Sequence, residues 1–103
     1  MDKATVTRNV VRALRQVYDP EVPVNVYDLG LIYEINVDDD NKVFIKMTLT
    51  VPTCPMADSV IEEVNNAVKD APGVTDVAIE LTFEPKWDKS RMSDAALLEL
   101  GLL

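Results

Sequence analysis

The stretch VPTCPM, residues 51–56, contains the only cysteine of a chain that has no histidine. Two prolines flank Cys54, and a helical pattern of apolar residues begins directly behind it. Because proline is favoured at the first position of a helix, the sequence predicts that Cys54 caps this helix and Pro55 opens it. Unpaired backbone N–H groups and the helix dipole stabilise negative charge there, which raises the thiolate fraction of a cysteine. The position therefore favours a reactive thiolate over a small buried apolar cysteine.

A lone thiolate without histidine restricts the chemistry. Acyl transfer and peptide hydrolysis need a base beside the nucleophile, usually histidine. A cysteine phosphatase loop needs an arginine close behind the cysteine, and PMADSV at residues 55–60 has none. One cysteine also excludes a redox pair. Ligation of a soft metal, transient persulfide or disulfide chemistry, and no chemistry at all remain open. Because an iron–sulfur cluster commonly needs four cysteine ligands, ligation implies a second chain, carboxylates or small thiols.

Three carboxylates precede the first predicted strand, namely Asp19, Glu21 and Asp28. They could be hard metal ligands or polar anchors for a partner. They could equally be ordinary loop residues, with Asp19 ending the first helix because it precedes Pro20. A second acidic run, residues 38–40, lacks the glycine and distant glutamate of an EF-hand loop, so calcium is not expected there.

Apolar spacing predicts six elements in the order α-β-β-α-β-α. They are a helix over residues 5–18 capped by Thr5 or Thr7, strands over 31–37 and 43–51, a helix from Met56 to Pro72-Gly73, a strand over 74–83, and a short helix from a Ser93 cap toward Gly101. This order predicts an α+β, two-layer fold in which two helices cover one face of a small three-stranded mixed sheet.

The predicted topology brings three loops to one edge of the sheet. In the hairpin, residues 28–30 lie beside residues 51–53, because the first strand starts where the second ends. If the third strand runs parallel to the second, residues 84–87 reach the same edge. Trp87 could then be an interface residue or an anchor of this segment on the core, and the core is favoured. Loops at the carboxyl ends of strands often form sites in α/β units, and here they surround Cys54.

The composition is typical of one globular domain over residues 1–103. The net charge is −8, with 10 basic and 18 acidic residues. Such a charge repels phosphate backbones, so nucleic acid is not an expected partner. The charged N-terminus has no long apolar run, so neither a signal peptide nor a membrane span is expected, and a cytoplasmic location follows.

Three stretches, YDPEVPVNVYDLGLIYEI, MTLTVPTCPM and FEPKWDKSRMS, resemble the iron–sulfur cluster assembly family of the SufT and PaaD type, which includes the eukaryotic MIP18-like cluster-targeting component. The resemblance spans residues 17–93, with the motifs in the family's order and spacing. It implies a small domain like the carboxyl-terminal domain of NifU scaffolds, and a role in maturing iron–sulfur proteins.

Residue by residue, the resemblance places the family's motifs as follows. The acid pair falls on Asp19 and Glu21, DLGL on residues 28–31, T-x-x-x-C-P on Thr50, Cys54 and Pro55, and the tail motif on Trp87, Arg91 and Met92. The chain lacks the cysteine-rich extension of PaaD-type members, which favours the SufT-like branch. It also lacks the NifU-type Cys-x-x-Cys pair, which argues against a self-sufficient scaffold.

We therefore expect a non-enzymatic assembly factor that acts on client iron–sulfur proteins. Cys54 would bind iron, or a cluster held transiently with a second chain, either a homodimer partner or a carrier. Asp19, Glu21 and Asp28 would shape the site, and Thr50 and Thr53 would supply hydroxyls near the thiolate. The alternatives are a metal-free adaptor for clients, a PaaD-like subunit for oxygenase maturation, and a thiol-dependent transferase.

Overall fold

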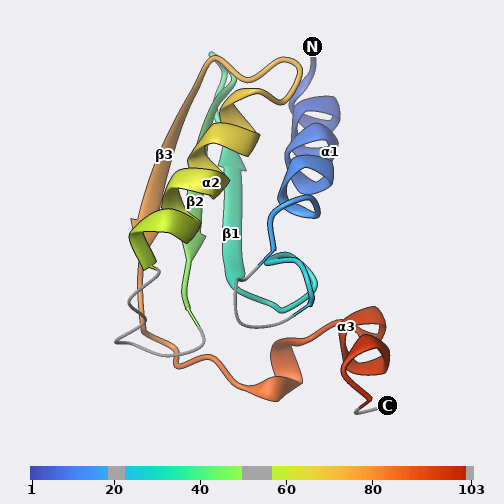
Figure 1. Cartoon of the computed structure of the whole chain (residues 1–103). Helices are drawn as coiled ribbons and strands as arrows, with labels where there is room; N and C mark the ends of the chain where they lie inside the picture. Colours follow the sequence, from blue (N-terminus) through green and yellow to red (C-terminus); the bar gives the residue numbers. More distant parts are fainter. Residues whose placement is uncertain (19–22, 50–56, 102–103) are drawn as a thin grey trace.

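The computed structural model describes residues 1–18, 23–49 and 57–101 of the chain. Its elements are α1 (Lys3–Leu14), β1 (Ile32–Val37), β2 (Lys42–Met47), α2 (Ala57–Lys69), β3 (Asp76–Leu81), the 3-10 helix η1 (Lys89–Arg91) and α3 (Asp94–Glu99). The predicted α+β order is confirmed, with η1 as a short addition (Figure 1).

The sheet has the strand order β1-β2-β3. Strands β1 and β2 are antiparallel, with Ile35 opposite Ile45, and β3 runs parallel to β2 with Ile79 opposite Ile45. The predicted mixed sheet is therefore confirmed. Helices α1 and α2 lie side by side over the sheet, α1 against β1 and α2 against β3 (Figure 1).

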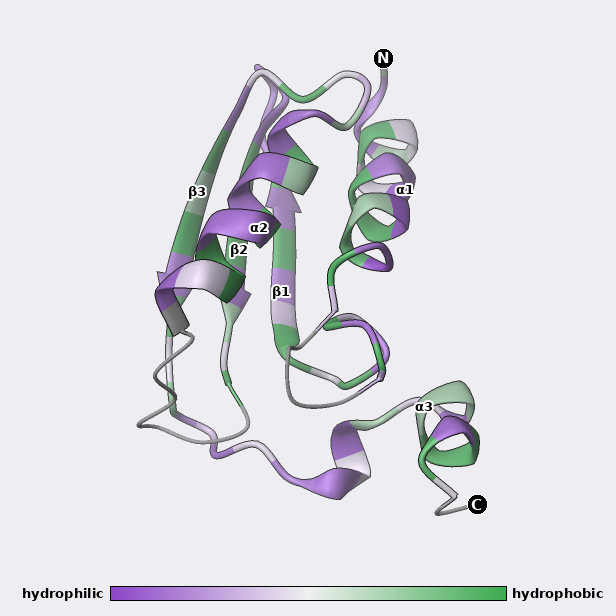
Figure 2. Cartoon of the chain, viewed as in Figure 1, coloured by the Kyte–Doolittle hydropathy of each residue, from purple (hydrophilic) through white to green (hydrophobic). Residues whose placement is uncertain are grey.

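The core forms where the apolar faces of these elements meet. The central contributors, each less than 3% exposed, are Val6, Val10 and Leu14 of α1, Val43, Ile45 and Met47 of β2, and Val60, Val64 and Val68 of α2. Burying each such side chain contributes about 1.5–3 kcal/mol. The period-two alternation of β2 leaves Phe44 and Lys46 on the opposite, open face of the sheet. Hydrophobic and hydrophilic residues accordingly alternate along these elements in Figure 2.

Helix α1 differs from its prediction at both ends. Its cap is Asp2, whose carboxylate accepts a hydrogen bond from the Thr5 backbone N–H at 2.7 Å, so the prediction of Thr5 or Thr7 was wrong. The helix ends at Leu14 instead of Tyr18. Beyond it, the Val17 carbonyl accepts from the Val26 N–H at 2.8 Å. That bond to the following loop draws the chain out of the helix.

The carboxyl-terminal helix begins as predicted. The Ser93 hydroxyl accepts from the Ala96 N–H at 3.1 Å, which confirms Ser93 as the cap of α3. Strands β2 and β3 end at Met47 and Leu81, earlier than their predicted ends at residues 51 and 83. The chain after Met47 and after Leu81 is therefore no longer part of a strand and can contribute side chains to a site.

Candidate functional site

Three segments meet at one end of the sheet, which we call the loop edge. The Thr48 N–H donates to the Leu31 carbonyl at 2.8 Å, which joins the exit of β2 to the start of β1. The Thr82 N–H donates to the Met47 carbonyl at 2.8 Å, which brings the end of β3 to the same place. The predicted approach of residues 84–87 to residues 28–30 is confirmed by the bond from Trp87 to Leu29, whereas residues 51–53 lie outside the described residues.

Most of the predicted site residues lie outside the part of the chain that the structure describes. Cys54, Thr50 and Thr53 fall within residues 50–56, and Asp19 and Glu21 fall within residues 19–22, both outside the described residues. Their assignments, and the cap at Cys54, therefore stay predictions. Asp28 is the predicted site residue that the structure describes.

Asp28 is committed to holding its own loop. One carboxylate oxygen accepts from the Asn25 side-chain amide at 2.7 Å, and the Asp28 N–H donates back to the Asn25 side-chain oxygen at 2.8 Å. The other carboxylate oxygen lies 4.0 Å from an Arg15 guanidinium nitrogen, and the Asp28 side chain is 16% exposed. The Asp28 carbonyl accepts from the Ser93 N–H at 2.8 Å. These contacts give Asp28 a structural role within its own loop, and its role toward a metal or a partner stays a prediction.

Residues 82–93, which we call the tail segment, lie directly on the loop of residues 28–31. The Trp87 indole N–H donates to the Leu29 carbonyl at 2.7 Å, and the indole packs against the core. The predicted anchoring role of Trp87 is confirmed. Gly30 has a φ of +80°, and a Cβ there would run into the Arg91 backbone carbonyl. Glycine is needed at this position both for its backbone conformation and for the close approach of the tail segment.

Tyr33 adds two further ties to the tail segment. The register of β1 against β2 shifts between Ile32 and Glu34, so Tyr33 falls at a β-bulge, a feature that re-aims a side chain. The Tyr33 hydroxyl donates to the Pro85 carbonyl at 2.7 Å, and the Arg91 guanidinium lies 4.4 Å from the centre of the Tyr33 ring.

The tail segment also has its own local turn. The Asp88 carboxylate accepts from the Ser90 N–H at 2.8 Å and from the Ser90 hydroxyl. The hydrogen bonds from Ser90 hold the pKa of Asp88 below its ordinary value of 3.8. This turn directly precedes Arg91, and the Arg91 carbonyl lies against Gly30.

Sequence reasoning missed Asn25 and Tyr33. The spacing N-x-x-D at residues 25–28 is a signal for a side-chain turn and could have pointed to Asn25. No pattern in the residues around Tyr33 predicts its role, because that role depends on where the tail segment lies in the fold.

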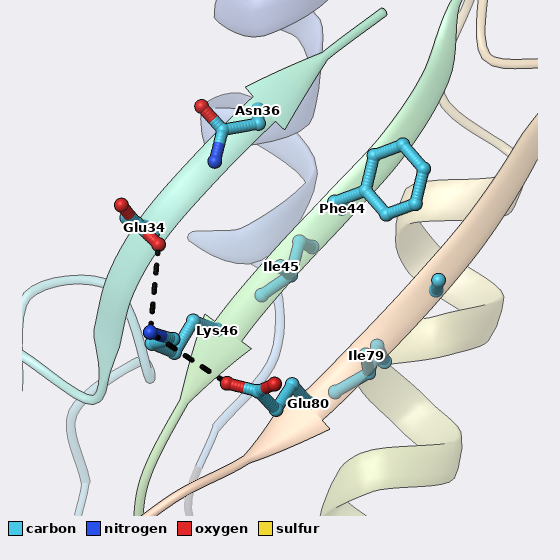
Figure 3. Close-up of a pocket in the computed structure, with 8 residues that line it drawn as sticks. Glu34, Asn36, Phe44, Ile45, Lys46, Ile79 and Glu80 are labelled. Carbon is cyan, nitrogen blue, oxygen red and sulfur yellow. Dashed lines mark ion pairs between the residues drawn. The ribbon is translucent and has the colours of Figure 1, made fainter. Parts of the chain in front are cut away.

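One other hollow in the described part of the chain contributes nothing to this site. On the open face of the sheet, a hollow of about 320 Å³ lies beside Lys46, which is 3.8 Å from Glu34 and 3.6 Å from Glu80 (Figure 3). In residues 1–18, 23–49 and 57–101, no three acidic, histidine or cysteine side chains gather to hold a metal ion. No helix in those ranges is long and apolar enough to cross a membrane.

The family model described as iron–sulfur cluster assembly protein matches residues 7–81, from α1 to the end of β3. The chain belongs to the iron–sulfur cluster assembly protein family. The family resemblance seen in the three sequence motifs is thereby confirmed.

Three relatives illustrate the range of the family. The chain is 58% identical over 95 residues to an Fe-S protein maturation auxiliary factor of Porphyromonas gingivalis, covering 92% of this chain and 90% of the relative. It is 36% identical to the maturation auxiliary factor SufT of Staphylococcus aureus, covering 84% and 98%. It is 33% identical to an iron–sulfur cluster carrier protein of Synechocystis, covering 82% of this chain but 24% of the carrier.

The fold also matches a solved structure. A domain of unknown function from Bacillus anthracis superposes with a TM-score of 0.89 at 32% identity, covering 98% of this chain and 95% of that domain. Its likeness over almost the whole chain confirms the two-layer architecture.

Proposed function

We propose that this chain is a non-enzymatic, cytoplasmic factor that matures iron–sulfur proteins, with Cys54 as the ligand of the iron or cluster in transit. The observation that carries the proposal is the 58% identity, over nearly the full length of both chains, to a maturation auxiliary factor. Iron, or the cluster, is cargo in this scheme and passes to a client or carrier protein.

The position of Cys54 along the chain supports a site at the loop edge. Leu49 is buried beside that edge, and α2 begins at Ala57, three residues after Cys54. Three residues of chain span at most about 11 Å, so Cys54 stays within that distance of the Ala57 Cα. The loop of residues 28–31 and the tail segment border the same edge.

A single thiol sets the stoichiometry of the proposal. The chain has one cysteine and no histidine, whereas a cluster commonly takes four cysteine ligands. We therefore assign the remaining ligands to a second chain, with Asp19 and Glu21 as supporting carboxylates and Thr50 and Thr53 as hydroxyl donors. Asp28 would hold the neighbouring loop. That second chain is another copy of this chain, or a carrier, which the similarity to one part of a longer carrier protein supports as the alternative.

Anaerobic reconstitution with iron and sulfide tests the proposal on the native chain and on Cys54→Ser. A serine oxygen can still cap a helix, but it is a poor soft-metal ligand. The native chain is expected to gain thiolate-to-iron charge-transfer bands and to shift toward dimer in solution. Cys54→Ser is expected to keep its circular dichroism spectrum and to lose both changes.

Three results would count against parts of this scheme. Iron that stays bound to Cys54→Ser without these bands would move the ligand role to the carboxylates. A native chain that stays colourless, together with client maturation by Cys54→Ser in a deletion strain, would leave the metal-free adaptor. Turnover of a thioester by the native chain would revive the transferase.

A further inference from the structure

Helix α1 is basic, whereas the chain as a whole is acidic. The chain carries a net charge of −8, yet Lys3–Leu14 contains no aspartate or glutamate. Four of the chain's ten basic residues lie on this helix or at its cap, namely Lys3, Arg8, Arg12 and Arg15. The neighbouring helix α2 has the opposite character, with Asp58, Glu62 and Glu63 against a single Lys69.

Three of these residues form one line, which we call the basic stripe: Arg8, Arg12 and Arg15. Spacings of four and three residues place them on one face of a helix, along about 10 Å. All three are exposed, on the side of α1 opposite its buried valines. Their side chains border a shallow groove of about 350 Å³ whose floor includes the half-buried Val11. The groove can therefore admit both a carboxylate and an apolar side chain.

The stability of α1 explains only part of the stripe, because the helix dipole favours positive charge at Arg12 and Arg15 near its carboxyl end but not at Arg8. Like charges at a spacing of four residues destabilise a helix, and Arg8 and Arg12 have this spacing. In the part of the chain that the structure describes, the carboxylate within 4.0 Å of the stripe is that of Asp28, beside Arg15. Arg8 donates to the Thr5 hydroxyl at 3.3 Å. The cationic groups of Arg8 and Arg12 are thus presented to solvent.

The charge pattern selects among occupants. Duplex nucleic acid carries charge over a long surface and would be repelled by the acidic remainder of the chain. A membrane-surface helix needs a free apolar face, whereas the apolar face of α1 is buried in the core. A short carboxylate-rich protein segment would contact the stripe without contacting the acidic remainder of the chain. Bidentate pairing of carboxylates with arginine suits such a contact.

We propose that the basic stripe is the docking site for a short acidic segment of a partner protein. Arg15 lies at the end of the stripe and also borders Asp28, so a docked partner extends toward the loop edge. That the partner is a client or carrier rests on the proposed function, whereas the binding itself does not.

The test uses a fluorescent alanine-rich helical peptide with glutamates at i, i+4 and i+7, and a matched peptide with lysines in their place. The native chain is expected to bind the glutamate peptide in a salt-dependent manner, with amide shifts concentrated on α1. Arg8→Glu with Arg12→Glu is expected to lose about tenfold in affinity and to gain binding of the lysine peptide. Lys69→Glu with Lys86→Glu makes the same change in net charge elsewhere and is expected to stay within about twofold of native.

Several outcomes would overturn the docking proposal. Equal losses in the two double variants would mean that net charge alone controls binding. Tighter binding of duplex DNA or anionic vesicles than of the glutamate peptide would reject a protein partner. Self-association of the native chain that Arg8→Glu with Arg12→Glu abolishes would make a second copy the occupant. Peptide binding is expected to be unchanged in Cys54→Ser, so loss of iron binding leaves this proposal standing.

Discussion

The two ends of the sheet are held in different ways. At the hairpin end, Asp38 closes the turn locally, because its carboxylate accepts from the N–H groups of Asp40 and Lys42, both at 2.9 Å. At the loop edge, the bonds from Trp87 to Leu29 and from Tyr33 to Pro85 join residues 58 and 52 positions apart. The hairpin turn is closed locally and is also bonded by Thr75, whose N–H and hydroxyl donate to the Asn41 and Asp40 carbonyls, whereas the loop edge depends on a segment that follows the whole sheet in the sequence. The geometry beside the proposed site is therefore a property of the whole fold.

Gly30→Ala should break the loop edge most severely. Alanine would have to adopt a positive φ, and its Cβ would occupy the space of the Arg91 carbonyl. We expect a loss of about 3 kcal/mol in the free energy of unfolding, measured by urea denaturation. Gly101→Ala is the matched control, since Gly101 also has a positive φ but no atom within 4 Å of an added Cβ. A loss no larger than that of the control would show that the tail segment adapts freely.

Trp87→Phe should weaken the loop edge without removing its apolar packing. The Leu29 carbonyl loses its indole donor, and we expect a loss of about 1.5 kcal/mol in chemical denaturation followed by circular dichroism. Amide hydrogen exchange should rise at Leu31 and Ser93 while remaining native at Lys42. Uniform exchange changes at both ends would contradict the separation between them.

Asp38→Ala tests the hairpin end. Two backbone N–H groups lose their shared acceptor, and we expect a loss of about 1 kcal/mol. Iron binding by the native cysteine should be unaffected, because the change lies at the far end of the sheet. Asp38→Asn keeps an acceptor and should recover most of the stability. Impaired iron binding in Asp38→Ala would show that the two ends are coupled.

Acid should produce the smallest difference. The Ser90 hydrogen bonds lower the pKa of Asp88 below 3.8, so the stability that this carboxylate contributes is complete above pH 3.8. It is lost as the pH falls through the lower folded value. The fluorescence of Trp87, the only tryptophan, should report loosening of the tail segment below pH 3.8. Asp88→Asn should show a weaker pH response in that range, and an identical response would remove Asp88 from the account.

Local patterns predicted the part of the fold that local contacts determine. The alternation of β2 and the Ser93 cap follow from neighbouring residues, and the sequence predicted both. The predicted start of α1 was wrong because the turn before Val6 carries no large apolar residue to mark it. The convergence of three segments followed from strand direction alone.

The candidate site was less accessible to such reasoning. The sequence alone could not predict the structural role of Asp28, because that role depends on Asn25, Arg15 and the tail segment together. The family resemblance singled out Arg91 as part of the tail motif. Its contact with Tyr33, however, depends on a β-bulge that the residue types do not predict. The role of Cys54 stays a prediction, resting on its residue type and its place before α2.

The reach of the tail segment has a practical consequence for moving this module between proteins. The family match stops at residue 81, whereas the contacts that hold the loop of residues 28–31 come from as far as Ser93. A transferred fragment that ends at Leu81 would contain the complete sheet, but the Leu29 and Asp28 carbonyls would lose their hydrogen-bond donors. The smallest portable unit therefore extends at least twelve residues past the family boundary, and chimaeras should be joined beyond Ser93.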